Sequence, residues 1–151
     1  MRRPHGVLLS AVVLAAALGL TGCPAQPAPE QCPAPPDGTW WGSWQSTAYP
    51  TLRRGVASAT LDVENDTVSG TATLDGSGAG SGTVSGTVSC RTVSLVISGA
   101  QPFETMTVTA TLSDDAVGST MVGTYSSQAF TIPTTVADQP EQGHLLLGRP
   151  G

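Results

Sequence analysis

After Gly38 the chain alternates apolar and polar residues with a period of two, and this alternation limits the possible folds more than any other feature. Residues 67–74 (TVSGTATL), for example, carry hydroxyl side chains at every second position. Successive side chains of a β-strand point to opposite faces of a sheet, so the pattern predicts half-buried strands. Since no segment beyond residue 22 has the 3.6-residue period of an amphipathic helix, we expect an all-β domain.

Seven segments follow this pattern, separated by residues typical of turns. They cover residues 39–49, 56–64, 67–74, 82–89, 92–98, 103–112 and 119–126, with a possible eighth strand at 128–132. Residues 134–151 are predicted to form a C-terminal tail, in which 145–147 could form one further short strand. We therefore expect residues 38–133 to form an antiparallel up-and-down meander of seven or eight short strands closed into a small barrel, with a β-sandwich as the alternative.

The N-terminus has the organisation of an export signal. Arg2 and Arg3 precede an apolar run over residues 7–20, which is 14 residues long. As a helix this run would measure about 21 Å at 1.5 Å per residue, whereas the hydrocarbon core of a bilayer is about 30 Å thick. Its length is therefore typical of the apolar region of a signal peptide.

The signal ends in Leu20, Thr21, Gly22 and Cys23, which resemble the lipobox of bacterial lipoproteins. The resemblance implies cleavage after residue 22 and attachment of diacylglycerol to the thiol of Cys23, with acylation, for example by palmitate, of the new amino group. It also implies a location in the bacterial cell envelope, with the membrane as a partner through the lipid and the domain facing the periplasm or the exterior. The alternative is an ordinary secreted protein in which Cys23 forms a disulfide.

Residues 23–37 contain many prolines, and we expect them to form an extended spacer after the lipidated cysteine. Without residues 1–22 the chain has 151 − 22 = 129 residues, and its formal charge changes from −5 to −7 because Arg2 and Arg3 are lost. Four arginines and no lysine remain. A basic surface for nucleic acid is therefore not expected.

Two cysteines remain beside Cys23. Cys32 lies near the end of the spacer, and Cys90 occupies, with Arg91, a turn between two predicted strands. Because an exported protein folds in an oxidising compartment, we predict that Cys32 and Cys90 form a disulfide. The alternatives are two free thiols or pairing with another chain.

Three tryptophans lie on the first predicted strand. The period of two places Trp40 and Trp44 on one face and Trp41 on the other. Trp40 and Trp44, and the later Tyr125, are candidates either for the core of the barrel or for the wall of a ligand cavity. Three glycines on apolar strand faces would leave room for the tryptophans or for a ligand; they are Gly70, Gly86 and Gly123.

The segments Gly38-Thr39-Trp40 and Gly123-Thr124-Tyr125 are similar to motifs of the lipocalin and avidin barrels, the calycin group. The resemblance implies a barrel over about residues 38–132. The domain is shorter than a lipocalin, and its Gly-Thr-Tyr segment lies late in the chain, so no ligand-binding residue is transferred from this group.

Residues that could carry chemistry are few. His144 is the only histidine after residue 22, and it lies in the predicted tail. Three acidic residues alternate near one turn, Asp62, Glu64 and Asp66, and we expect them to lie on a solvated face. No catalytic residue, metal site or cofactor is therefore expected. We expect a non-enzymatic lipoprotein with a structural or interaction role, with an envelope protein as a possible partner. The alternative is a lipocalin-like carrier of a small hydrophobic ligand.

Overall fold

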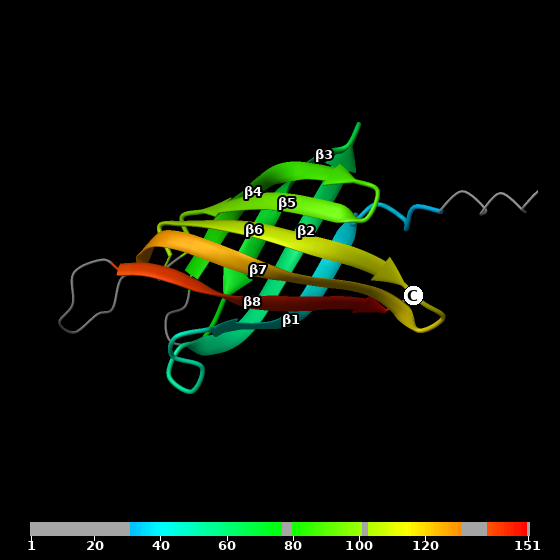
Figure 1. The fold of residues 1–151 in the computed structure, drawn as a ribbon. Coiled ribbons are helices and arrows are strands. Elements are labelled where there is room, and N and C mark those ends of the chain that lie inside the picture. The colour runs from blue at the N-terminus through cyan, green and yellow to red at the C-terminus, as the bar shows by residue number, and fades with distance from the viewer. Residues whose placement is uncertain (1–30, 77–79, 101–102, 131–138, 151) are drawn as a thin grey trace, which may run out of the picture. The chain divides into compact units, whose positions relative to one another are not determined.

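The fold is a closed antiparallel β-barrel of eight strands (Figure 1). The computed structural model describes residues 31–76, 80–100, 103–130 and 139–150. The chain divides into two units, 1–30 and 31–151, and every described residue belongs to the second. The strands are β1 (Gly38–Ser46), β2 (Arg54–Glu64), β3 (Thr67–Leu74), β4 (Gly80–Ser89), β5 (Thr92–Ser98), β6 (Thr105–Asp114), β7 (Gly118–Phe130) and β8 (Gln139–Pro150).

Each strand pairs with the next strand along the chain, and β8 pairs with β1 to close the sheet. The predicted up-and-down barrel is therefore confirmed, and the alternative sandwich is wrong. Its outline is that of a calycin barrel. Closure leaves no exposed sheet edge in the barrel, which protects a chain with only 11% charged residues from edge-to-edge association.

The apolar residues of the alternating sequence point into the barrel, and the polar residues between them point outward. In β6 the threonines are exposed, whereas Met106, Val108, Ala110 and Leu112 are buried. The same pattern holds along β3, where Val68, with 0% exposure, faces the interior. Apolar side chains from all eight strands thus form one core cluster.

Two of the strand connections are tight turns that need unusual backbone conformations. Asn65 and Asp66 join β2 to β3 with φ angles of 49° and 64°, which confirms the predicted two-residue turn. Cys90 has a φ of 50° in the connection between β4 and β5. Asn and Asp tolerate this left-handed region better than most residues, and Cys90 occupies it as part of a disulfide.

The last strand is longer than the sequence indicates. A tail was expected over residues 134–151, but residues 139–150 form β8, which pairs along most of its length with β7 and over residues 143–148 with β1. The short strand expected at 145–147 is only its central part. The separate strand expected at 128–132 is also wrong, because residues 128–130 continue β7; residues 131 and 132 lie outside the described residues.

The three glycines on apolar faces do not open space in the barrel. A Cβ atom on Gly70 or Gly123 would collide with a carbonyl oxygen of the neighbouring strand, Thr60 in the first case and Thr109 in the second. A Cβ atom on Gly86 would collide with the carbonyl oxygen of Ser94 in the same way. The expectation of free room is therefore wrong: neighbouring backbone occupies these positions, as it does at the glycine bends of small barrels.

Residues 31–37, expected to belong to the extended spacer, instead cross one end of the barrel, and we call them the end cap. Pro36 is buried, and its carbonyl oxygen accepts a hydrogen bond from Trp40 Nε1 at 2.9 Å. The backbone N–H of Ala34 donates to Asp114 Oδ2 at 2.8 Å, and Arg149 donates to the carbonyl of Asp37. The spacer interpretation is therefore wrong for these seven residues, while residues 23–30 lie outside the described part of the chain.

The end cap and the chain turns define two ends of the barrel. The capped end holds the end cap, the β2–β3, β4–β5 and β6–β7 turns and the C-terminus, all on the right in Figure 1. The opposite end, where β1, β3, β5 and β7 end and β2, β4, β6 and β8 begin, is called the loop end.

Candidate functional site

The two cysteines predicted to pair do form a disulfide. Cys32 of the end cap and Cys90 of the β4–β5 turn have Cα atoms 4.8 Å apart, within the usual range of about 4.4–6.8 Å. Arg91 Nη2 beside this bond donates to the carbonyl of Gln31 at 3.3 Å. Cys23, the predicted lipidation site, lies outside the described residues.

Hydrogen bonds also hold the end cap at the β6–β7 turn. The hydroxyl of Ser119 donates to the Asp114 carboxylate, and with the backbone N–H of Ala34 it lowers the pKa of that carboxyl. Arg149 packs over the ring of Trp40, its Cζ 5.0 Å from the ring centroid. The end cap is therefore fixed at three points of the barrel rim: the β4–β5 turn, the β6–β7 turn and the β1–β8 seam.

The predicted ligand-facing or core residues all lie in the core. Trp40 and Trp44 have exposures of 0% and 1%, whereas Trp41 is 55% exposed, which confirms the predicted register of β1. Tyr125 is 2% exposed, and its ring meets those of Trp44 and Phe103 edge to face at centroid distances of 6.3 and 5.4 Å. These aromatic rings fill the loop end of the barrel, while Trp40 fills the capped end.

Side chains occupy the interior positions along the whole barrel. The fully buried side chains include both large aromatics and aliphatic residues from β3, β5, β6 and β7. Barrels of eight strands are just wide enough for side chains to fill them or for one small ligand. Here the inward positions belong to Trp, Leu, Val, Ile and Met side chains that pack on one another.

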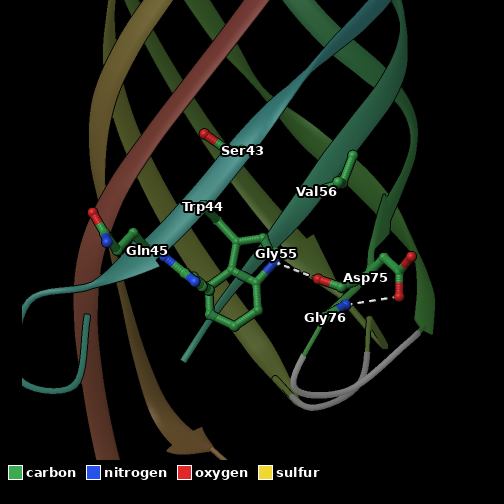
Figure 2. Close-up of a pocket in the computed structure, with 8 residues that line it drawn as sticks. Ser43, Trp44, Gln45, Gly55, Val56, Asp75 and Gly76 are labelled. Carbon is green, nitrogen blue, oxygen red and sulfur yellow. Dashed lines mark hydrogen bonds between the residues drawn. The ribbon is translucent and has the colours of Figure 1, made fainter. Parts of the chain in front are cut away.

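A groove of about 490 Å³ opens on the outer wall near the loop end (Figure 2). Trp44 Nε1 donates to the carbonyl of Asp75 at 3.0 Å, and Gly55 stands opposite Trp44 on β2. A Cβ atom on Gly55 would collide with that carbonyl, so only glycine leaves room for this contact. The groove thus lies over the loop end of the paired strands β1 and β2, next to the buried indole of Trp44.

The lining of this groove is mixed in polarity. Its residues are Ser43, Trp44, Gln45, Arg54, Gly55, Val56, Asp75 and Gly76. Gln45 Nε2 already donates to the carbonyl of Pro50, and one oxygen of Asp75 accepts from Gly76 N–H. Arg54 and Asp75 place opposite charges on the groove, which suits a small polar molecule rather than an apolar one. None of the eight lining residues is a histidine or a cysteine.

The loop end contains a buried polar cluster that sequence reasoning missed. Glu141 on β8 is 2% exposed and forms an ion pair with Arg53. Arg53 lies over the ring of Tyr49, with its Cζ 4.2 Å from the ring centroid. The β1–β2 connection thereby covers this end of the core. Glu141 was assigned to the tail, and the inward phase of β8 is the signal that could have identified it.

Two polar atoms in this cluster have no hydrogen-bond partner among the described residues. They are the hydroxyl oxygen of Tyr125 and Glu141 Oε1, both buried. Burial raises the pKa of the Tyr125 phenol above its ordinary value, and the negative charge of Glu141 raises it further, while Arg53 opposes the shift. A buried polar atom without a partner costs about 1–3 kcal/mol. The hydrogen bonding of buried polar atoms is therefore less complete at the loop end than at the capped end.

A row of mostly apolar side chains crosses the outer face of strands β2, β1, β8 and β7. Val56, Ser43, Leu146 and Val122 are successive register partners across β2, β1, β8 and β7. Val56, Leu146 and Val122 are 58%, 50% and 53% exposed, and Trp41 lies two residues from Ser43 on the same face. Elsewhere the outer wall is rich in threonine and serine. This row, which we call the outer apolar row, is therefore more apolar than the rest of the outer wall.

The other residues named from the sequence lie outside the groove and the buried polar cluster. His144 is exposed on β8, next to Thr124 of β7 and Gln45 of β1. Asp62, Glu64 and Asp66 are exposed, as expected. Within the described ranges no group of three or more His, Cys, Asp or Glu residues is placed to hold a metal ion. The same part of the chain contains no helix long and apolar enough to cross a membrane.

No family model, no curated protein and no solved structure matches this chain.

Proposed function

We propose that this chain is a membrane-anchored lipoprotein of the bacterial cell envelope with a non-enzymatic structural or interaction role. The observation that carries the proposal is the packing of the barrel, whose inward positions are taken by its own side chains. A carrier of apolar ligands needs an internal cavity, typically of about 300 Å³ or more. The groove near Trp44 instead opens outward and carries charged and polar residues.

The lipobox at residues 20–23 supports the anchor, and the outer wall supports a surface role. Exposed large apolar side chains cluster in the outer apolar row, whereas most of the outer wall presents hydroxyl groups. Exposed apolar surface is typical of contact regions when it is contiguous. An envelope protein that contacts this wall is the kind of partner that the proposal implies.

Mass spectrometry of protein produced in a lipoprotein-processing bacterium tests the proposal. The expected species begins at Cys23, carries acyl chains and holds no small molecule when sprayed under native conditions. The matched variant Cys23→Ser should lack the acyl mass and stay out of the detergent phase. An acylated mass in Cys23→Ser would refute the anchor, and a stoichiometric apolar ligand in the native spectrum would favour the carrier instead.

A further inference from the structure

We propose that the groove beside Trp44 binds a small zwitterion of the amino-acid class, with the carboxylate of the ligand on Arg54 and its ammonium group on Asp75. The groove has a volume of about 490 Å³, within the range of about 300–1,000 Å³ that is usual for small-molecule sites. The inference goes beyond the proposed function. It does not depend on the lipid anchor, because all the residues that line the groove belong to the described barrel.

Two opposite charges on this groove have no ion-pair partner among the described residues. Three arginines of the barrel contact other residues: Arg53, Arg91 and Arg149. Arg54, in contrast, is exposed, and its guanidinium forms no ion pair and no hydrogen bond with the described residues. Within the same part of the chain, the carboxylate of Asp75 accepts only from the backbone N–H of Gly76, through one of its oxygens. Both charges are therefore available to a ligand.

Backbone contacts hold the two charged residues near each other. Trp44 Nε1 donates to the carbonyl of Asp75 at 3.0 Å (Figure 2), and the N–H of Asp75 donates to the carbonyl of Val56 at 2.9 Å. The next residue, Gly76, lies so close to β2 that a Cβ atom on it would collide with the carbonyl oxygen of Arg54. The chain that carries the carboxylate is thus packed directly against the strand that carries the guanidinium.

The groove suits a zwitterion better than a sugar or an apolar molecule. A sugar is commonly bound against an exposed aromatic face, but the ring of Trp44 is 1% exposed and packs edge to face on Phe103, with the centroids 5.3 Å apart. An apolar molecule would remove two charged groups from water without giving them partners, which costs free energy. An amino acid supplies both partners, because its carboxylate accepts from the guanidinium and its ammonium group donates to the carboxylate.

The apolar part of the lining indicates the size of the ligand side chain. Val56 is 58% exposed on the same groove and offers an apolar contact beside the two charges. We therefore expect a ligand with a small apolar side chain. L-Alanine and L-alanyl-L-alanine share this chemistry and serve as probes for its two sources, free amino acids and short peptides.

A nuclear magnetic resonance titration of the ¹⁵N-labelled protein tests the site. The protein is used as the bacterium produces it, in a non-ionic detergent. The indole N–H of Trp44 and the backbone amides of Gly55 and Gly76 should shift and saturate, whereas the indole N–H of Trp40 should not. Because exposed ion pairs are individually weak, we expect half-saturation near about 1 mM. A ligand this weak is lost on purification, so the mass spectrum expected above is unchanged.

Variants of the protein and of the probe identify the two charge contacts. Arg54→Gln and Asp75→Asn should each weaken binding by about fivefold, and the asparagine keeps the oxygen that accepts from Gly76. The matched changes Arg91→Gln and Asp62→Asn, outside the groove, should have no effect. In Asp75→Asn, alanine and N-acetylalanine should bind alike, because the partner of the ammonium group is gone. In Arg54→Gln, alanine and alanine amide should bind alike for the corresponding reason.

The outcomes separate the site from its assigned chemistry. Tighter binding of alanine would assign free amino acids as the ligand, and tighter binding of the dipeptide would assign short peptides. If native protein bound N-acetylalanine and alanine amide as tightly as alanine, the contacts with both charges would be wrong. No saturable shift below about 50 mM of either probe would overturn the site itself.

Discussion

The capped end and the loop end of the barrel are closed by different means. At the capped end a covalent bond and four hydrogen bonds hold the end cap over Trp40. At the loop end the β1–β2 connection is held by the buried ion pair of Arg53 with Glu141 and by hydrogen bonds such as that from Thr47 N–H to the carbonyl of Gln142. It covers a cluster in which two buried polar atoms have no hydrogen-bond partner among the described residues. One barrel thus combines an end closed by a covalent bond with an end in which two buried polar atoms have no hydrogen-bond partner among the described residues.

The largest expected effect comes from the bond at the capped end. Cys32→Ser/Cys90→Ser removes a link between residues 58 positions apart. The chain-entropy model assigns about 4 kcal/mol to a loop of this size. Urea unfolding of the oxidised protein and the double variant should show this difference in the free energy of unfolding. A loss of less than about 1 kcal/mol would mean that the end cap is not fixed in solution.

Removal of one partner of the ion pair at the loop end should have the next largest effect. Glu141→Gln removes the carboxylate charge from this ion pair, and loss of one partner of a buried pair costs about 3–5 kcal/mol. We expect the lower limit, because the Arg53 side chain keeps 11% exposure. The double variant Arg53→Met/Glu141→Leu should recover most of the loss. If Glu141→Gln is as stable as the native protein, the pair does not close this end.

Tyr125→Phe should have the smallest effect and the opposite sign. The tyrosine hydroxyl has no hydrogen-bond partner among the described residues, so its loss should leave stability unchanged at neutral pH or increase it by about 1 kcal/mol. Because the folded pKa of Tyr125 is raised, its contribution to stability is intact below pH 10 and is lost as the pH rises further. The variant should therefore keep more stability than the native protein above pH 10. A destabilised Tyr125→Phe would indicate a hydrogen bond that this account omits.

The sequence predicts the barrel well because its alternation is a local signal. In β3 and β6 hydroxyl side chains occupy every second position, so strand bounds and inward faces follow directly. The tight turn at Asn65 and Asp66 is predictable for the same reason, since both residue types tolerate positive φ. The disulfide was also predictable, because an oxidising compartment and an even pair of cysteines point to it.

The elements that depend on distant contacts were not predictable. Strand β8 contains Pro140 and Gly143 and three successive leucines, so its alternation is obscured, and its pairing with β1 supplies the missing evidence. Gly143 is needed there because a Cβ atom would lie 2.6 Å from the ring of Tyr125. The end cap could not be predicted because a proline-rich segment has the same composition whether it packs on a barrel end or extends freely.

The candidate sites could be predicted from the sequence only in part, for the same reason. The positions of Trp40 and Trp44 inside the core follow from the period of two, but the groove beside Trp44 depends on Gly55 and on the carbonyl of Asp75, 31 residues away. The burial of Glu141 likewise depends on the closure of the barrel. Sites formed by three or more strands need the register of the sheet, which the local pattern does not contain.

Hydrogen exchange of the indole N–H groups tests the difference between the two ends most directly. Trp40 Nε1 donates to Pro36 at the capped end, and Trp44 Nε1 donates to Asp75 at the loop end, while Trp41 is exposed. In the oxidised protein the Trp40 proton should exchange most slowly and the Trp41 proton fastest. Reduction of the disulfide should accelerate Trp40, relative to backbone amides of β6, and leave Trp44 unchanged. Equal acceleration of Trp40 and Trp44 would contradict the account, because the bond would then stabilise the whole barrel rather than its capped end.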